Sequence, residues 1–132
     1  LCFSNIIKDD DQLRLIFIDP RGGKISNNYR SPYYDLAKLC HSLLGGYDHI
    51  VNDIAEIKFN NDMLANIKFG QDMDKHKELF QSFVASLSLS YLLVRKIEIS
   101  LFLSMLPLHT ESSKKVSMLM LRASELILSL EK

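Results

Sequence analysis

The sequence predicts a mostly helical α+β fold, in which a short N-terminal β-hairpin packs on a bundle of about four to five helices. Two short apolar runs near the N-terminus, separated by polar residues, are typical of a hairpin. Apolar residues then recur at helical spacing through most of the remaining sequence. With 132 residues, 47% hydrophobic and 24% charged, the chain suits one compact domain with a buried core. We therefore expect a single domain over residues 1–132, with a hairpin segment at 1–30 and a helical part at 31–132.

The predicted hairpin joins a strand that opens at Ile6 to a second strand over 13–18, through a polar turn. Antiparallel pairing would bring Asn5, just before the first strand, and Asp19, just after the second, to the same end. An amide and a carboxylate are therefore expected side by side. Asp-Pro is also an ordinary turn starter, so the alternative is that Asp19 caps the loop beginning with Pro20.

The first predicted helix follows a loop over residues 20–30. Ser31 suits its N-cap, Pro32 its first helical position, and Gly45-Gly46 its end. Its apolar stripe is formed by Leu36, Leu39, Cys40, Leu43 and Leu44.

A second helix is expected over 47–57. The alternation around Ile57, Leu64 and Phe69 then predicts a small hairpin, although a helix that reaches Asn60 fits the same residues.

Three amphipathic helices complete the prediction. The first opens near Asp72 or Asp74, the second spans 90–105, and the third opens at Ser112 or Ser113. Their apolar stripes are Leu79, Phe80, Phe83, Val84 and Leu87, then Leu93, Ile97 and Leu101, then Val116, Leu119, Met120, Ala123, Leu126, Ile127 and Leu130.

Charge and composition argue against several classes of function. Sixteen basic residues balance sixteen acidic ones, which argues against a nucleic-acid or anionic-membrane partner bound by bulk electrostatics. The most apolar stretch, over 79–108, is interrupted by charged residues, so no membrane-spanning run is expected. Cys2 and Cys40 give no disulfide framework, which favours a reducing, cytoplasmic setting.

The usual metal and nucleophile motifs do not occur in the sequence. Cys40 and His41 are neighbours on a helix and therefore point in different directions. No G-x-S-x-G motif is present. The histidines, which show no zinc-site spacing, are His41, His49, His76 and His109.

Three short motifs follow one another early in the sequence: Leu-Cys-Phe-Ser-Asn-Ile-Ile at 1–7, Ile-Phe-Ile-Asp at 16–19 and Tyr-Asp-Leu-Ala-Lys-Leu at 34–39. Together they resemble the catalytic core of the aminoglycoside phosphotransferase and choline kinase family, which is similar in architecture to protein kinases. The family signature is His-Gly-Asp, four residues, Asn, a short hairpin ending in Ile-Asp, and Asp-Leu-Ala at a helix start. The run over 18–43 also resembles a bacterial subgroup of polysaccharide-biosynthesis and sugar-related phosphotransferases.

This resemblance, which covers residues 1 to about 51, implies roles for individual side chains. Asn5 and Asp19 are implied to be ligands of Mg²⁺, which bridges the phosphates of ATP. Asp35 is implied to anchor the catalytic loop. Arg21 departs from the aromatic or acidic residue often found in the family; it is a candidate for contact with phosphate or substrate, or for a salt bridge. His109 is a candidate for lining the acceptor pocket, or else an ordinary loop histidine.

The resemblance implies the C-terminal lobe of an ATP-dependent phosphotransferase that acts on a hydroxyl of a small molecule, with a sugar as one candidate. Because four residues precede Asn5, the His-Gly-Asp with the catalytic base would lie directly upstream of Leu1, beyond which the nucleotide-binding lobe would lie. The chain alone is expected to be inactive. Its expected partners are nucleotide, the alcohol substrate, the missing N-terminal lobe, and a second copy bound through exposed apolar surface.

Two alternatives stay open. The chain could be a non-catalytic helical interaction or regulatory domain, in which Met105, Met118 and Met120 dock a partner rather than fill the core. It could also be a degenerate kinase relative that binds nucleotide without turnover.

Overall fold

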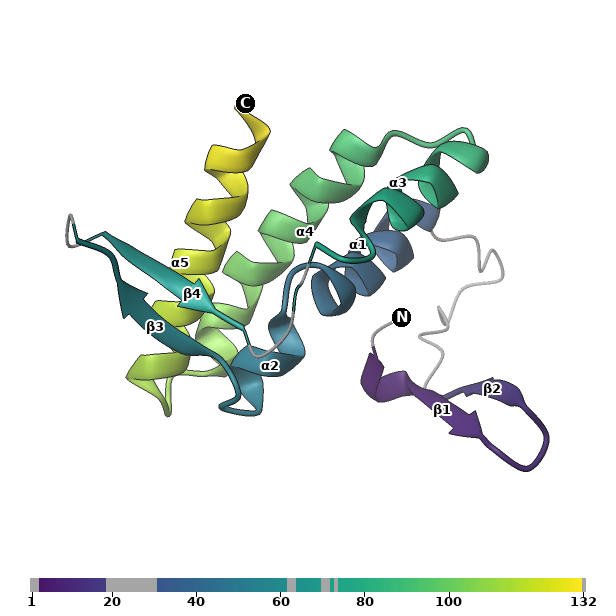
Figure 1. The fold of residues 1–132 in the computed structure, drawn as a ribbon, viewed down its shortest axis with the longest axis horizontal. Helices are drawn as coiled ribbons and strands as arrows, with labels where there is room; N and C mark the ends of the chain where they lie inside the picture. Colours follow the sequence, from purple (N-terminus) through teal and green to yellow (C-terminus); the bar gives the residue numbers. More distant parts are fainter. Residues whose placement is uncertain (1–2, 19–30, 62–63, 70–71, 73, 132) are drawn as a thin grey trace.

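The computed structural model describes residues 3–18, 31–61, 64–69, 72 and 74–131, and these form the predicted mostly helical α+β fold (Figure 1). The hairpin of β1 and β2 extends from a body of helices, and a second hairpin lies against α5. The elements, with η for a 3-10 turn, are η1 (Phe3–Asn5), β1 (Ile6–Asp9), β2 (Arg14–Phe17), α1 (Pro32–Leu43), α2 (Tyr47–Val51), β3 (Glu56–Phe59), β4 (Ala65–Lys68), α3 (Lys77–Ser86), α4 (Tyr91–Met105), η2 (Leu106–Leu108) and α5 (Ser113–Leu130).

The N-terminal hairpin is antiparallel, as predicted, with Ile6 opposite Phe17 and Asp9 opposite Arg14. Asp9 organises its tip, because its carboxylate accepts hydrogen bonds from the Gln12 backbone and from Arg14, both at 3.1 Å. All four residues of β2 are exposed. The hairpin therefore holds itself together through its backbone ladder and its tip more than through a buried face.

The second hairpin, β3–β4, is confirmed, and the alternative of a helix reaching Asn60 is wrong. Helix α2 already ends at Val51, so the expected helix over 47–57 is also too long. The cause is local: Asp53 has a φ of 59°, in the left-handed region, which a right-handed helix cannot continue through. The Asn52 side chain closes this end by donating to the Asp48 carbonyl at 2.7 Å.

The long helices begin where polar caps predict, with one exception. Ser90 caps α4 and Ser112 caps α5, each by accepting a hydrogen bond at 3.3 Å from the backbone three residues later. Helix α3 instead begins at Lys77, later than the predicted start near Asp72 or Asp74. Residues 74–76 form a turn, in which the Asp74 carbonyl accepts the Lys77 N–H at 2.9 Å.

The core has two parts that share α4. One part lies between α1, α3 and α4, and the other between α2, α4 and α5. The first comprises Leu36, Ala37, Cys40, Leu44, Phe80, Val84, Val94 and Leu101; the second comprises Ile50, Ala55, Ile99, Phe102, Met118, Leu119, Ala123 and Leu126. Because α4 is covered on two sides, its buried surface is much wider than the single stripe that the sequence predicts.

Some predicted stripe residues stay exposed. On α3, Phe80 and Val84 are buried, whereas Leu79 is 72% exposed and Phe83 47% exposed. On α5, Met120 is 53% exposed although Met118 is fully buried. The methionines are thus divided between core and surface.

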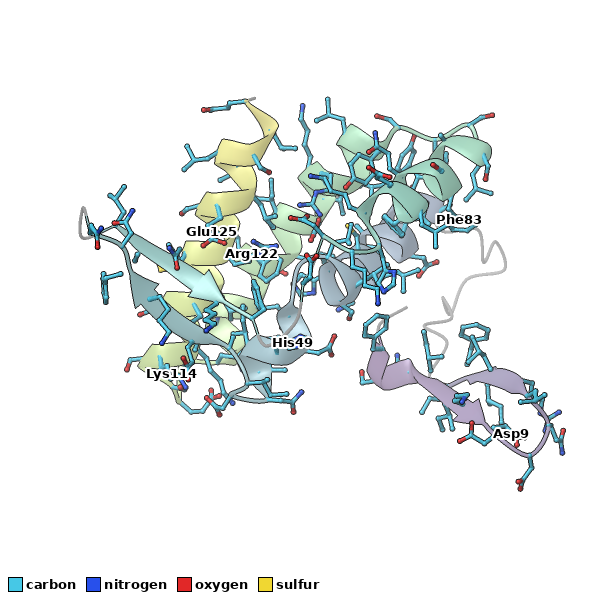
Figure 2. All side chains as sticks on the ribbon, in the orientation of Figure 1. Asp9, His49, Phe83, Lys114, Arg122 and Glu125 are labelled. Atoms are coloured by element: carbon cyan, nitrogen blue, oxygen red, sulfur yellow. The ribbon has the colours of Figure 1, made fainter. Side chains whose placement is uncertain are left out.

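Arg122 of α5 holds the end of α1. Its guanidinium donates to the carbonyls of Leu44 (2.8 Å) and Gly45 (2.9 Å), and it pairs with Glu125 at 2.9 Å beside β4 (Figure 2). It also stacks over the Phe69 ring, 5.1 Å from its centroid. A cation thus satisfies carbonyls left open at a helix C-terminus, where the macrodipole also favours positive charge.

Candidate functional site

Asn5 lies next to Ile18 at the open end of the N-terminal hairpin, opposite its turn. Beyond the last strand pair, the Ile18 N–H donates to the Asn5 carbonyl at 2.9 Å. The antiparallel pairing thus extends one residue pair past the strands. Asp19, the next residue, and Arg21 lie outside the described residues.

Asn5 is half-buried at the last position of η1. The Ser4 hydroxyl donates to its Oδ1 atom at 3.4 Å. Two residues earlier, the Phe3 N–H donates to Ser42 Oγ on α1, also at 3.4 Å. The turn that carries Asn5 is therefore hydrogen-bonded both to the residue that follows β2 and to the helical body.

Asp35 lies in the first turn of α1 and is exposed. The positive end of the helix dipole favours a carboxylate at this position. The same helix carries Ser42 in its last turn, where it contacts η1.

His109 follows η2, and both of its ring nitrogens have polar neighbours. Its Nε2 atom lies 3.2 Å from Tyr47 Oη on α2, and its Nδ1 atom lies 3.5 Å from the Glu111 carboxylate. The ring is therefore oriented by a hydroxyl on one side and a carboxylate on the other.

A buried polar cluster, which the sequence reasoning missed, joins α1 to α4. Arg95 Nη1 lies 2.7 Å from Glu98 Oε2, and Glu98 is fully buried. The Cys40 thiol lies between them: it donates to Glu98 Oε2 at 3.2 Å and accepts from Arg95 Nη1 at 3.2 Å. The sequence does contain a signal for this cluster, because Arg95 and Glu98 are opposite charges three residues apart in an otherwise apolar helix. Such residues can form an ion pair when the helix is buried.

Burial dominates the electrostatics of this cluster. It raises the pKa of the Cys40 thiol, and the adjacent Glu98 carboxylate raises it further, so the sulfur stays protonated and unreactive. Burial also raises the pKa of Glu98, against the opposing influence of Arg95. The cluster therefore links α1 to α4 and has the geometry of a structural contact.

His41 is a second buried polar group. It is fully buried, stacks on Tyr47 with ring centroids 4.4 Å apart, and contacts the Phe102 ring edge-on at 4.1 Å. Neither ring nitrogen has a hydrogen-bond partner among the residues that the structure describes. Burial, and to a smaller extent the nearby charge of Lys38, lowers the pKa of His41 to about 3, so the ring is neutral.

An open apolar groove of about 500 Å³ lies between α1 and α3. Its lining is Leu43, His76, Leu79, Phe80 and Phe83. Phe83 projects outward from α3 in Figure 2.

The described ranges, residues 3–18, 31–61, 64–69, 72 and 74–131, contain neither a metal-ligand cluster nor a membrane span. No group of three or more His, Cys, Asp or Glu residues there is arranged to hold a metal ion. Within the same ranges, none of the helices combines the length and apolar character needed to span a bilayer.

Comparison with known proteins gave no match, whether with protein-family models, with curated proteins or with solved structures.

Proposed function

We propose that the chain is the C-terminal lobe of an ATP-dependent phosphotransferase similar to aminoglycoside phosphotransferases and choline kinases, which transfers the γ-phosphoryl group to a hydroxyl of a small molecule. The hydrogen bond between the backbones of Asn5 and Ile18 carries the proposal. Asp19 is joined to Ile18 by a peptide bond, which keeps their Cα atoms about 3.8 Å apart. The hairpin register thus supports the proximity of amide and carboxylate that the motif resemblance requires.

The donor set suits Mg²⁺. Both side chains offer oxygen, and Mg²⁺ prefers oxygen ligands while keeping waters and substrate phosphates in its remaining positions, so two protein ligands suffice. When bound, the ion would neutralise charge on the phosphates of ATP. Asn5 would present Oδ1, which accepts from Ser4 at 3.4 Å and has a second lone pair for the ion.

The remaining parts of the proposal concern support and partners. Asp35 would hold the catalytic loop from the start of α1. The missing N-terminal lobe and the nucleotide would cover the hairpin, whose Leu15 and Phe17 are 57% and 59% exposed. Apolar side chains exposed on a two-stranded ribbon need such a cover, because an isolated hairpin is only marginally stable in water.

Manganese titration of the ¹⁵N-labelled chain tests the metal site, because paramagnetic Mn²⁺ broadens only the signals near it. We expect broadening at the Asn5 side-chain amide and the Ile18 N–H, and its loss in Asp19→Ala. Asp11→Ala, at the far tip of the same hairpin, is the matched control and should leave the broadening unchanged. Broadening confined to the acidic tip would refute the proposed site.

The coding sequence ahead of Leu1 gives an independent test. The proposal expects it to encode His-Gly-Asp or a close variant, since that aspartate supplies the general base. Any other residues there would leave the phosphotransferase without its base.

A helical interaction domain is the second candidate, favoured by the apolar stripe that α3 leaves open. Leu79, Phe83 and Leu87 are 72%, 47% and 47% exposed at a spacing of four residues. Helix faces of this kind dock on apolar partners, including further copies of the same chain. Size-exclusion chromatography separates the candidates: concentration-dependent self-association that Phe83→Ser abolishes, together with no response to Mn²⁺ and ATP, would favour the interaction domain.

A further inference from the structure

We infer that the outer edge of β2 is an interface at which a second copy of the chain pairs, strand against strand and antiparallel. The N-terminal hairpin is a two-stranded sheet, so each strand has one edge that the other does not cover. Such an edge presents backbone N–H and C=O groups to any strand that approaches it. This interface lies outside the proposed function, because it involves neither the candidate metal ion nor the nucleotide.

The register shows which backbone groups of β2 point outward. In an antiparallel pair of strands, residues that bond to the other strand alternate with residues whose N–H and C=O groups face away from it. The Ile18 N–H donates to the Asn5 carbonyl at 2.9 Å, so these residues form a bonded pair. The alternation then makes Ile16 a bonded residue and leaves Leu15 and Phe17 facing away from β1. The N–H and C=O groups of Leu15 and Phe17 therefore lie along the outer edge.

The second hairpin follows the same rule, and there the outward group has a partner. The Asn60 N–H donates to the Leu64 carbonyl at 3.0 Å just beyond the strands, which makes Ile67 an outward-facing residue of β4. The Ile67 N–H indeed donates to the Glu125 carboxylate of α5, at 3.0 Å. Helix α5 thus occupies this position on the edge of β4. Among the described residues, the two outward N–H groups of β2 have no such acceptor.

The side chains along the outer edge of β2 are apolar and exposed. Figure 1 shows the hairpin extending from the helical body. Leu15 and Phe17 lie on one face of the ribbon and Ile16 on the other, and all three are exposed. Arg14, the charged residue of β2, is already paired with Asp9 of the same hairpin at 3.1 Å. The strand therefore lacks the unpaired charges and the proline that usually keep an edge strand from pairing.

A second copy of β2 fits this edge because the strand is complementary to itself. With the two-fold axis beside Ile16, Leu15 of each copy bonds with Phe17 of the other, so every outward N–H and C=O group of these residues gains a partner. Leucine then lies opposite an aromatic ring and Ile16 opposite its own copy, which are favourable apolar pairs across strands. Arg14 falls opposite Ile18 of the second copy, so no like charges meet. The two ribbons become one larger sheet, whereas a lone hairpin is only marginally stable.

The contact between the two copies is short, because β2 has four residues. An interface of this size is weak and transient. We therefore expect dimers that form and dissociate quickly, and whose fraction rises with protein concentration by mass action.

Amide hydrogen exchange of the ¹⁵N-labelled chain, measured in dilute and in concentrated samples, tests this interface residue by residue. In the dilute sample the Leu15 and Phe17 amides should exchange freely, whereas the Ile16 amide is protected by its bond to β1. In the concentrated sample the Leu15 and Phe17 amides should exchange at least about ten-fold more slowly.

Two variants of Leu15 and one control assign the protection to this edge. Leu15→Pro removes an outward N–H, and proline is tolerated in an edge strand where the N–H faces solvent. Leu15→Lys places a charge on the edge and serves equally if the proline variant does not fold. Each should abolish the concentration-dependent protection of Phe17. Leu128→Lys, which changes a leucine of similar exposure (60%) on α5, should leave it unchanged.

Three results would overturn the inference. One is the absence of any concentration dependence up to roughly 1 mM, since even weak interfaces associate there. The second is self-association, by sedimentation velocity, that Phe83→Ser abolishes and Leu15→Lys leaves intact, which would place the interface on α3. The third is protection of the Leu15 and Phe17 amides in a chain that stays monomeric, which would mean that the chain covers this edge itself. None of these results depends on the Mn²⁺ titration, so the proposed function and the interface can fail separately.

Discussion

Removal of Arg95 should destabilise the fold far more than removal of an exposed cation. Glu98 is fully buried. One of its oxygens has no hydrogen-bond partner within the described part of the chain, and the other is bonded to Arg95 and the Cys40 thiol. Arg95→Met keeps much of the side-chain volume but leaves this carboxylate without its counter-charge. Breaking a buried pair in this way costs roughly 3–5 kcal/mol.

Such a loss is a large fraction of the roughly 5–15 kcal/mol that holds a domain of this size together. Urea unfolding at pH 7, followed by circular dichroism, measures it. Lys58→Met is the matched control: Lys58 pairs with Glu56 at 3.2 Å, but both side chains are more than half exposed, so a change of about 0.5 kcal/mol or less is expected.

The double variant Arg95→Met/Glu98→Leu tests whether the loss of stability comes from the unpaired charge or from the change in side-chain packing. Replacing both members of a buried pair with apolar residues is often neutral or stabilising, so the double variant should be more stable than Arg95→Met alone. Two results would refute the reasoning. One is that the losses of unfolding free energy in Arg95→Met and Glu98→Leu simply add up in the double variant. The other is that Arg95→Met loses less than about 1 kcal/mol while the denaturant slope stays unchanged.

Three further predictions concern the end of α1. The pKa of His41 is about 3 in the folded chain and near 6.5 in the unfolded chain, so the unfolded chain takes up a proton first as the pH decreases. The free energy of unfolding should therefore fall by about 1.4 kcal/mol per pH unit between these two values. Urea unfolding at pH 7 and pH 5 should show this decrease, and His41→Leu should lack it. Arg122→Met, which removes two donors from helix-end carbonyls, should cost roughly 2–4 kcal/mol by urea unfolding, and recovery of more than half of that loss by Arg122→Lys would contradict the bidentate geometry. Gly46→Ala should lower the melting temperature, because Gly46 has a φ of +75° and a Cβ there would lie 2.4 Å from the Phe69 ring; an unchanged melting curve would contradict that contact.

The features predicted best from the sequence are those decided by neighbouring residues. Ser90 and Ser112 cap helices because a cap needs only the next three residues. The register of the first hairpin follows from two apolar runs and the turn between them. The same local logic brings Asn5 next to Ile18, and it needs no knowledge of the rest of the chain.

The features that the sequence could not predict depend on what covers each surface. Glu98 interrupts an apolar run, yet it is fully buried because α1 and α5 both pack on α4. Leu79 fits the stripe of α3, yet it is 72% exposed because no described element covers it. The contact of Ser42 with Phe3 spans 39 residues, and no periodicity carries that information. Local patterns therefore predict elements and hairpin ends, whereas the pairing of helix faces decides which polar groups become structural.

The last turn of α1 and the glycines after it form the junction at which the molecule is assembled. Within residues 40–46, Cys40 contacts the Arg95–Glu98 pair of α4, Ser42 holds η1, and the Leu44 and Gly45 carbonyls accept from Arg122 of α5.

This arrangement separates two kinds of perturbation. The contacts to α4 and α5 lie between parts of the core, so their loss should appear mainly as a lower free energy of unfolding. The contact to η1 leads out to an exposed hairpin, so its loss should change the geometry at Asn5 while most of the core stays intact. Arg95→Met removes a contact between α4 and Cys40, whereas Ser42→Ala removes the contact of the same turn of α1 with η1. Arg95→Met should therefore lower the free energy of unfolding more than Ser42→Ala does.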